Sequence, residues 1–341
     1  MRPKVFAAQA IPGAALDVLR QAAEVWVYPY LERQISVDEL VGAAKRSDWL
    51  YVLHETSVTA EVINANPNLK GIGCMAAGHS FIDMEAANAR KIPVIMGDPA
   101  ISVIPATGDL TIAMLLALAY RLVEGDRYTR CGKFRQEQTV ALMGIGCPGK
   151  TVGMLGMGKL ALHMVPRLRA FDMHVLYNKP TRLATAREQE LGIEWAPSLL
   201  DLMRRSDFVC IACRYGPSTH KLIGWRELDQ MKPEAYLINT GRGRIVDEPE
   251  LIRALQERRI AGAALDVYWN EPYRNDDPDS REPWVPEELC KMENVILAPH
   301  NGGATWDVRS RKAVSVAEGM LAVMRGERPK TLLNPEIYAN G

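Results

Sequence analysis

The stretch Thr151-Val-Gly-Met-Leu-Gly156-Met-Gly158-Lys-Leu-Ala161 lies near the middle of the 341-residue chain. Its first five residues are typical of a buried strand, and an apolar pattern at helical spacing follows over 162–168. The GxGxxA spacing between them allows a tight turn at Gly156, close approach of a phosphate at Gly158, and close helix–strand packing at Ala161. Free N–H groups at the start of the helix would bind a pyrophosphate, so the pattern predicts a dinucleotide fold.

A second glycine-rich pattern overlaps the first. The residues 144–151 read Gly-Ile-Gly-Cys-Pro-Gly-Lys-Thr and fit the phosphate-loop spacing GxxxxGK[ST]. That motif must follow a strand and open a helix, whereas Lys150 and Thr151 lead into a strand. Pro148 also interrupts the run of N–H donors. We therefore reject a nucleoside-triphosphatase function.

Strand and helix signals alternate on both sides of the turn. Apolar runs typical of buried strands occupy 5–8, 49–53 and 69–74 in a first series, and 152–155, 173–177, 208–212, 235–238, 261–265 and 295–298 in a second. Such alternation predicts parallel sheets with crossover helices. A long helical stretch from about 105 to 132 separates the two series, and another follows over about 306–324.

The predicted fold class is therefore α/β, with two Rossmann-like, doubly wound parallel-sheet domains separated by a cleft. One domain is expected to be discontinuous, formed by 1–104 and about 307–341, because the last helical stretch is expected to return to the first series. The second is expected over about 105–306 and would bind the dinucleotide.

Composition limits the classes of partner and location. Lys plus Arg and Asp plus Glu both total 41, so the formal net charge is zero, which argues against a nucleic-acid or membrane-surface binder. No apolar stretch reaches about 18 residues, and the N-terminus lacks a signal-peptide core, so we expect a cytoplasmic protein with no membrane span. The six cysteines show no zinc spacing, and Cys210 and Cys213 end an apolar run, which favours a buried strand over a redox pair and predicts no metal site.

The choice of dinucleotide depends on the residues after the second strand of the second series. A carboxylate is expected there for the ribose 2′-hydroxyl of NAD. The sequence reads Asn178-Lys179-Pro180-Thr181-Arg182 instead, with no carboxylate and two cations that could pair with a 2′-phosphate. NADP(H) is therefore predicted as the preferred cofactor, with NAD(H) possible.

Three further segments follow second-series strands, at the sheet edge where open α/β proteins bind ligands. They are Leu237-Ile-Asn-Thr-Gly-Arg242-Gly, Gly262-Ala-Ala-Leu-Asp266-Val-Tyr-Trp-Asn-Glu271-Pro, and Val295-Ile-Leu-Ala-Pro-His300-Asn-Gly-Gly. Each places one arginine, one glutamate or one histidine just past a strand.

With the glycine turn, these segments resemble the D-isomer-specific 2-hydroxyacid dehydrogenase family, and in particular its glyoxylate/hydroxypyruvate reductase-like members. The resemblance covers nearly the whole chain, including Gly78-His-Ser-Phe-Ile-Asp83 as a substrate loop and Pro105-Ala-Thr107-Gly-Asp109 as the start of an inter-domain helix. It implies a flavodoxin-like substrate-binding domain, a homodimer through the helix from Pro105, and interconversion of a 2-oxo acid and its D-2-hydroxy acid.

That chemistry requires the three residue types. Arg242 presents a planar fork that can hold the substrate carboxylate and polarise the carbonyl. His300 can donate a proton to the forming alkoxide and accept it in the reverse direction. Glu271 beside the imidazole would stabilise its charged form. Arg242, Glu271 and His300 are the predicted catalytic residues.

The resemblance also assigns contacts to other residues. Asp266 would contact the nicotinamide carboxamide, and Gly302 and Gly303 would let the backbone approach the ring. The remaining predicted cofactor contacts are Thr107, Met157, Lys159, Leu160, Cys213, Arg214, Thr240 and Gly241, beside those of the glycine turn and of 178–182. The predicted substrate contacts are His54, Ala77, Gly78 and His79, together with Arg242.

Several departures and alternatives accompany this assignment. Arg214-Tyr-Gly-Pro217 replaces a proline-leucine-threonine-proline run of the family, and the segment 273–288 is longer than usual. Phosphite oxidation is disfavoured because 75–78 contains no lysine, and formate oxidation because Glu271 stands where those enzymes have glutamine. A dinucleotide-sensing corepressor or scaffold of the same fold remains open. Glyoxylate, hydroxypyruvate, an aromatic pyruvate and a sugar acid fit the three residues equally well.

Overall fold

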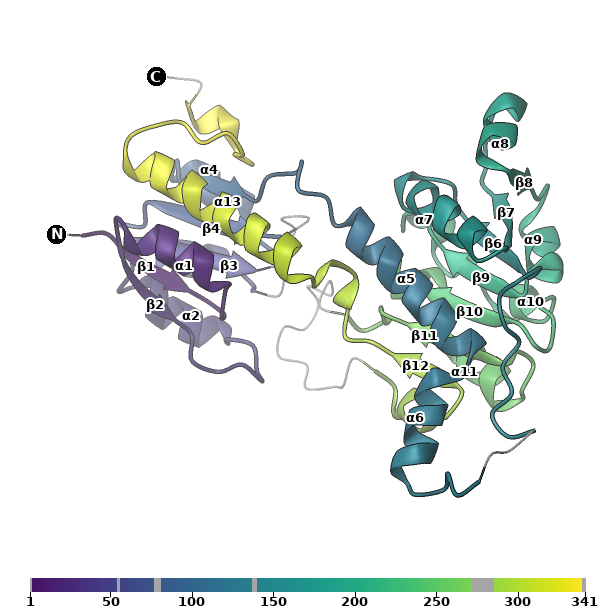
Figure 1. The fold of residues 1–341 in the computed structure, drawn as a ribbon. Helices are drawn as coiled ribbons and strands as arrows, with labels where there is room; N and C mark the ends of the chain where they lie inside the picture. Colours follow the sequence, from purple (N-terminus) through teal and green to yellow (C-terminus); the bar gives the residue numbers. More distant parts are fainter. Residues whose placement is uncertain (1, 54–55, 77–80, 137–139, 272–284, 339–341) are drawn as a thin grey trace. The chain divides into compact units, whose positions relative to one another are not determined.

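The structure is a computed structural model, and it describes residues 2–53, 56–76, 81–136, 140–271 and 285–338. The chain divides into two compact units (Figure 1). The first contains Met1–Ser102 and Trp306–Gly341, and the second contains Val103–Glu271 and Pro283–Thr305. The first unit is thus discontinuous in sequence, with the C-terminal helix packed beside the N-terminal one (Figure 1).

The first unit is a five-stranded parallel sheet in the order β2-β1-β3-β4-β5, which is the flavodoxin-like winding. Its strands are β1 (Lys4–Ala7), β2 (Glu24–Val27), β3 (Trp49–Leu53), β4 (Gly71–Met75) and β5 (Val94–Met96). Its helices are α1 (Gly13–Arg20), α2 (Val37–Ala44), α3 (Ala60–Asn64), α4 (Met84–Ala89) and α13 (Trp306–Met324), with the 3-10 turn η4 (Pro335–Tyr338).

The second unit is a seven-stranded parallel sheet in the order β12-β11-β10-β9-β6-β7-β8. Its strands are β6 (Thr151–Leu155), β7 (His174–Asn178), β8 (Ile193–Trp195), β9 (Phe208–Ile211), β10 (Tyr236–Asn239), β11 (Gly262–Leu265) and β12 (Val295–Leu297). Its helices are α5 (Ile104–Ala119), α6 (Leu122–Arg130), α7 (Lys159–Ala170), α8 (Thr185–Leu191), α9 (Leu199–Arg205), α10 (Trp225–Leu228), α11 (Glu248–Gln256) and α12 (Glu287–Lys291). The 3-10 turns are η1 (Pro217–Thr219), η2 (Gly243–Ile245) and η3 (Asn301–Gly303). The strand order reverses between β6 and β9, as in a Rossmann fold.

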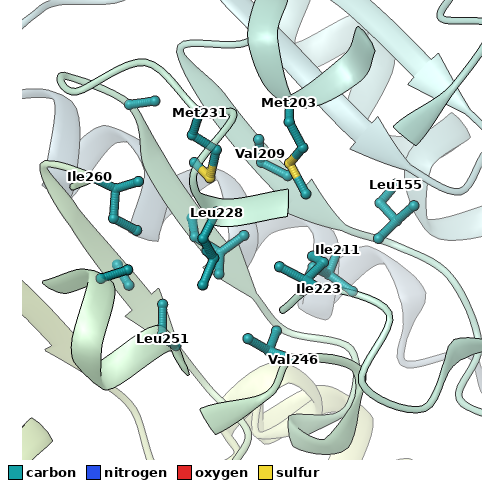
Figure 2. Close-up of a cluster of buried hydrophobic side chains, with 14 of the residues drawn as sticks. Leu155, Met203, Val209, Ile211, Ile223, Leu228, Met231, Val246, Leu251 and Ile260 are labelled. Carbon is teal, nitrogen blue, oxygen red and sulfur yellow. The ribbon is translucent and has the colours of Figure 1, made fainter. Parts of the chain in front are cut away.

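Helices cover both faces of each sheet, which confirms the predicted α/β class with two parallel-sheet domains. In the first unit α1 and α13 cover one face, and α2, α3 and α4 cover the other. In the second unit α5 and α7 cover one face. The opposite face packs on α9, α10 and α11; Figure 2 shows this cluster, in which Ile211, Leu228 and Leu251 come from β9, α10 and α11. The two apolar layers hold the strand ends of the second unit in fixed positions.

The prediction of one continuous helix from about 105 to 132 is wrong. The stretch forms two helices, α5 and α6, separated at Arg121, whose φ of 49° is left-handed. The carbonyl of Ala119 accepts the N–H of Ile145 at 3.0 Å, so the last turn of α5 bonds to a later segment instead of continuing. Among the described residues no single helix is long and apolar enough to span a membrane; α5 and α6, bent by 60°, meet that test only as a pair.

Candidate active site

The glycine turn lies at the carboxyl end of β6, between the ends of its two neighbours. Gly156 has a φ of +100°, and a Cβ there would lie 2.9 Å from the backbone nitrogen of Cys213, so the turn requires glycine. Its N–H donates to the carbonyl of Asn178 at 2.8 Å. The ends of β7 and β9 are thereby fixed beside the turn, and the segments 178–182 and 213–214 begin next to it.

The start of α7 has the features that a phosphate requires. A Cβ on Gly158 would meet no atom within 4 Å, and no side chain caps the helix there. Ala161 is buried against the sheet, which allows the close helix–strand packing that its small side chain predicts. Met157 is buried in the same core, and Lys159 and Leu160 form the first turn of α7. The residues therefore fit a dinucleotide pyrophosphate, while the contacts themselves remain predictions.

The segment after β7 holds the two cations predicted to select NADP(H). Asn178 donates from its amide to the carbonyl of Ala196 at 2.9 Å, which ties the strand end to the chain after β8. Lys179 is half-buried, and Pro180 and Thr181 are exposed. Arg182 forms a bidentate ion pair with Glu188.

Arg242 follows β10 in a loop that Asn239 organises. The Asn239 side chain accepts the N–H of Gly241 and donates to the carbonyl of Arg242, both at 3.0 Å. The Arg242 side chain is exposed and donates from Nη1 to the carbonyl of Gly241 at 2.8 Å. Thr240 is buried, and its hydroxyl lies 2.7 Å from that of Thr111 on α5.

His300 and Glu271 form a hydrogen-bonded pair past β12 and β11. The distance from His300 Nδ1 to Glu271 Oε2 is 2.8 Å, and the other carboxylate oxygen accepts the N–H of Tyr268 at 2.6 Å. Glu271 is 5% exposed, so its charge faces little water. The hydrogen bond to Glu271 raises the pKa of His300, with the Asp266 charge adding to the effect, while burial and the Arg242 charge oppose it.

Asp266 holds the turn that carries His300. Its two carboxylate oxygens accept the N–H groups of Asn301 and Gly302, at 2.5 and 2.8 Å. The hydroxyl of Thr107 donates to the carbonyl of Gly302 at 2.8 Å, and a Cβ on Gly302 would lie 3.1 Å from Thr107. Asp266, Thr107 and Gly302 therefore support the conformation of the turn that carries His300. A contact to nicotinamide stays a prediction for Asp266, Gly302 and Gly303.

The structure brings together most, not all, of the predicted residues. Those of the second unit lie at the carboxyl edge of its parallel sheet, after β6, β7, β9, β10, β11 and β12, with Thr107 on α5. Cys213 was predicted to end a buried strand, but β9 ends at Ile211 and Cys213 is half-buried in the loop that follows. Arg214 is exposed. The predicted substrate contacts His54, Ala77, Gly78 and His79 lie outside the described residues, as does 273–284 of the long loop. No group of His, Cys, Asp or Glu in the described part of the chain has the arrangement of a metal site.

Sequence reasoning missed two residues, Asn239 and Trp269, that stabilise the loops carrying Arg242 and Glu271. The ring N–H of Trp269 donates to the carbonyl of Val246 at 2.6 Å, and the backbone carbonyl of Trp269 accepts from Arg244 Nε at 3.2 Å. These two bonds connect the Arg242 loop to the Glu271 turn. Asn239 has a readable signal, because Asn two residues before Gly is typical of a side chain that closes its own turn. Trp269 has none, because its partners lie more than 20 residues away in the chain.

Comparisons with known proteins agree with this arrangement. The family model described as D-isomer specific 2-hydroxyacid dehydrogenase, NAD binding domain, matches residues 112–302. A glyoxylate reductase of Thermococcus gammatolerans is 38% identical over 99% of this chain and 97% of its own, and one of Pyrococcus furiosus is 37% identical over the same shares. The crystal structure of an NADPH-dependent glyoxylate/hydroxypyruvate reductase from Sinorhizobium meliloti is 27% identical, covers 97% of this chain and 98% of its own, and has a TM-score of 0.73.

Proposed function

The chain belongs to the D-isomer-specific 2-hydroxyacid dehydrogenase family, and on that premise we propose that Arg242, Glu271 and His300 carry out its reaction. It is an NAD(P)-dependent oxidoreductase that acts on 2-oxo and 2-hydroxy acids. The observation that carries the proposal is the 2.8 Å hydrogen bond between His300 Nδ1 and buried Glu271.

The proposed mechanism assigns one task to each side chain. The bond to Glu271 holds Nδ1 and leaves His300 Nε2 as the atom that donates the proton to the substrate oxygen. Arg242 binds the substrate carboxylate and polarises the carbonyl, which requires its fork to turn away from the carbonyl of Gly241. A reduced nicotinamide, when bound, supplies the hydride. In the oxidation direction His300 is unprotonated and accepts the hydroxyl proton.

We propose a small 2-oxo acid as the substrate and NADPH as the preferred cofactor. Relatives at 38% and 37% identity are glyoxylate reductases, so glyoxylate is the first substrate to test. Lys179 and Arg182 after β7, with no carboxylate at 178, support recognition of a 2′-phosphate. The similar Sinorhizobium protein is NADPH-dependent.

The experiment measures oxidation of NADPH and NADH with a panel of 2-oxo acids that includes glyoxylate and hydroxypyruvate. We expect turnover with a small 2-oxo acid and a higher kcat/KM for NADPH than for NADH. Turnover that is faster with NADH would overturn the cofactor preference alone. Tight cofactor binding without turnover of any 2-oxo acid would overturn the catalytic proposal and favour a dinucleotide-sensing role.

A further inference from the structure

The guanidinium of Arg182 contacts two side chains of the second unit, Glu188 and Trp195, and a third, Tyr177, bonds to the Glu188 carboxylate. Glu188 on α8 accepts from Arg182 Nε at 3.0 Å and from Nη2 at 2.8 Å. The hydroxyl of Tyr177 at the end of β7 donates to the same carboxylate at 2.5 Å. The guanidinium carbon lies 5.0 Å from the ring centroid of Trp195 on β8. These contacts distinguish Arg182 from an arginine whose side chain is surrounded only by solvent.

This arrangement fixes where the remaining donors of Arg182 point. Guanidinium is planar, so a bidentate bond through Nε and Nη2 directs Nη1 away from the carboxylate. Nη1 donates no hydrogen bond within the described part of the chain, and the Arg182 side chain is 49% exposed. The loop itself is also tied down, because the N–H of Leu183 donates to the hydroxyl of Tyr177 at 2.8 Å.

The held arginine lies on the segment that begins beside the glycine turn. Leu155 and Asn178 are paired in the sheet, and the Gly156 N–H bonds to the carbonyl of Asn178. In dinucleotide folds the ribose 2′ position falls at the end of this second strand. The exposed edge of Arg182 therefore belongs to the region where a 2′-phosphate would lie.

Charge counting and geometry give opposite predictions for Glu188. The Arg182–Glu188 pair is neutral, so counting charges predicts that Glu188 weakens the attraction for a phosphate. Geometry predicts the reverse, because a guanidinium already fixed in orientation loses less conformational freedom when it binds. Glu188 is only 5% exposed and both its carboxylate oxygens accept hydrogen bonds from Arg182, which favours a supporting role over direct repulsion of a ligand.

We propose that Glu188, Tyr177 and Trp195 are positioning residues that hold Arg182 in the orientation that binds the 2′-phosphate of NADP(H). The proposal rests on the cofactor preference proposed above and deepens it. Specificity for the phosphorylated dinucleotide then depends on a buried carboxylate that does not touch the ligand.

The test measures binding of 2′,5′-ADP and of 5′-AMP to the full-length protein by calorimetry. Glu188→Gln should weaken 2′,5′-ADP binding about five- to tenfold and leave 5′-AMP binding unchanged, because a charge-assisted fork is lost. The matched control is Glu190→Gln, which removes the same charge from an exposed position on α8 and should change neither affinity. Unchanged or tighter 2′,5′-ADP binding by Glu188→Gln would overturn the proposal.

A second variant leaves every charge in place and tests the positioning role even if Glu188→Gln does not fold. Tyr177→Phe removes only the hydroxyl, with its hydrogen bonds to Glu188 and from the N–H of Leu183, and should weaken 2′,5′-ADP binding by at least about twofold to threefold. In turnover, both variants should raise the KM for NADPH while kcat and the KM for NADH stay as in the wild type. A fall in kcat with both cofactors, or no change in the KM for NADPH, would contradict the positioning role.

The same titration separates the two proposals. A wild-type protein that binds 2′,5′-ADP no more tightly than 5′-AMP would overturn the NADPH preference, and this inference with it. A wild-type preference for 2′,5′-ADP that survives in Glu188→Gln would leave the NADPH preference standing and overturn only the role of Glu188.

Discussion

At the scale of single residues, the catalytic proposal depends most on the charge of His300. Glu271 raises the pKa of the imidazole above its ordinary value of 6.5. Reduction needs the protonated form, so kcat/KM for a 2-oxo acid should fall as the pH rises through this raised pKa. The same pair contributes to stability fully below the unfolded pKa and loses that contribution as the pH rises through the folded one.

Replacing Glu271 should therefore move the pH profile. In Glu271→Gln the imidazole loses its charged partner, and the fall in the rate of reduction should occur at a lower pH than in the wild type. The measurement is kcat/KM for glyoxylate across the pH range. Glu257→Gln removes a charge from the exposed end of α11 and serves as the control. An identical profile in Glu271→Gln would show that Glu271 does not set the protonation of His300.

Arg242 gives a second prediction at this scale. Its removal takes away a donor aimed at developing charge, so Arg242→Ala should lower kcat/KM about 100- to 1,000-fold. NADPH binding, measured by fluorescence titration, should be unchanged. Arg226→Ala, at an exposed position on α10, should keep wild-type turnover. Substantial activity in Arg242→Ala would refute the assignment of the substrate carboxylate to this residue.

At the scale of elements, the two glycines of the turn make different demands. Gly156 has a left-handed φ and no room for a Cβ, so Gly156→Ala should destabilise the second unit by about 1–3 kcal/mol. Gly158 has an ordinary φ and open space, so Gly158→Ala should fold as well as the wild type but bind NADPH at least about tenfold more weakly. Thermal melting and cofactor titration distinguish the two. Wild-type cofactor affinity in Gly158→Ala would place the pyrophosphate elsewhere.

The start of α2 offers a test of stability in the first unit. Ser36 accepts the N–H of Glu39, and the Glu39 carboxylate accepts the N–H of Ser36, so the two form a capping box. Ser36→Ala should lower the free energy of unfolding by about 1 kcal/mol. Denaturant unfolding followed by circular dichroism measures this, with the exposed Ser218→Ala as the control. Equal stability of the two variants would mean that Arg33, which also pairs with Glu39, holds the loop by itself.

Some secondary-structure elements could be predicted from the sequence and others could not. Buried strands such as β3 and β9 were predicted, because runs of apolar residues have few alternatives. The edge strands β2, β5 and β8 were missed, since each has at most four residues and none is buried along its whole length. The break between α5 and α6 was also missed, because it depends on a contact of Ala119 with a segment 26 residues later.

At the scale of the whole molecule, alternating signals predicted parallel sheets but not the order of their strands. That order decides the site, because the reversal between β6 and β9 places the end of β9 beside the glycine turn. The sequence placed the proposed catalytic residues Arg242, Glu271 and His300 just after strands, and the structure has them there. Their braces, Asn239 and Trp269, act through contacts that only the folded chain reveals.

The segment between α5 and β6 has features that bear on the oligomeric state of the protein. Large apolar side chains are exposed from the end of α5 to the glycine-rich segment before β6, namely Tyr120, Leu122, Phe134, Val140 and Met143. Exposed apolar side chains concentrated in one segment are typical of interaction surfaces, and by family resemblance we propose that this segment contributes to a homodimer interface.

Charges placed on that stretch should therefore dissociate the protein. Leu122→Glu combined with Val140→Glu should convert a dimer to a monomer in light scattering, because a dimer would bury both new charges without partners. Leu31→Glu, at an equally exposed apolar position of the first unit, should leave the mass unchanged. A wild-type monomer at micromolar concentration, or a double variant that remains dimeric, would exclude this surface as the interface.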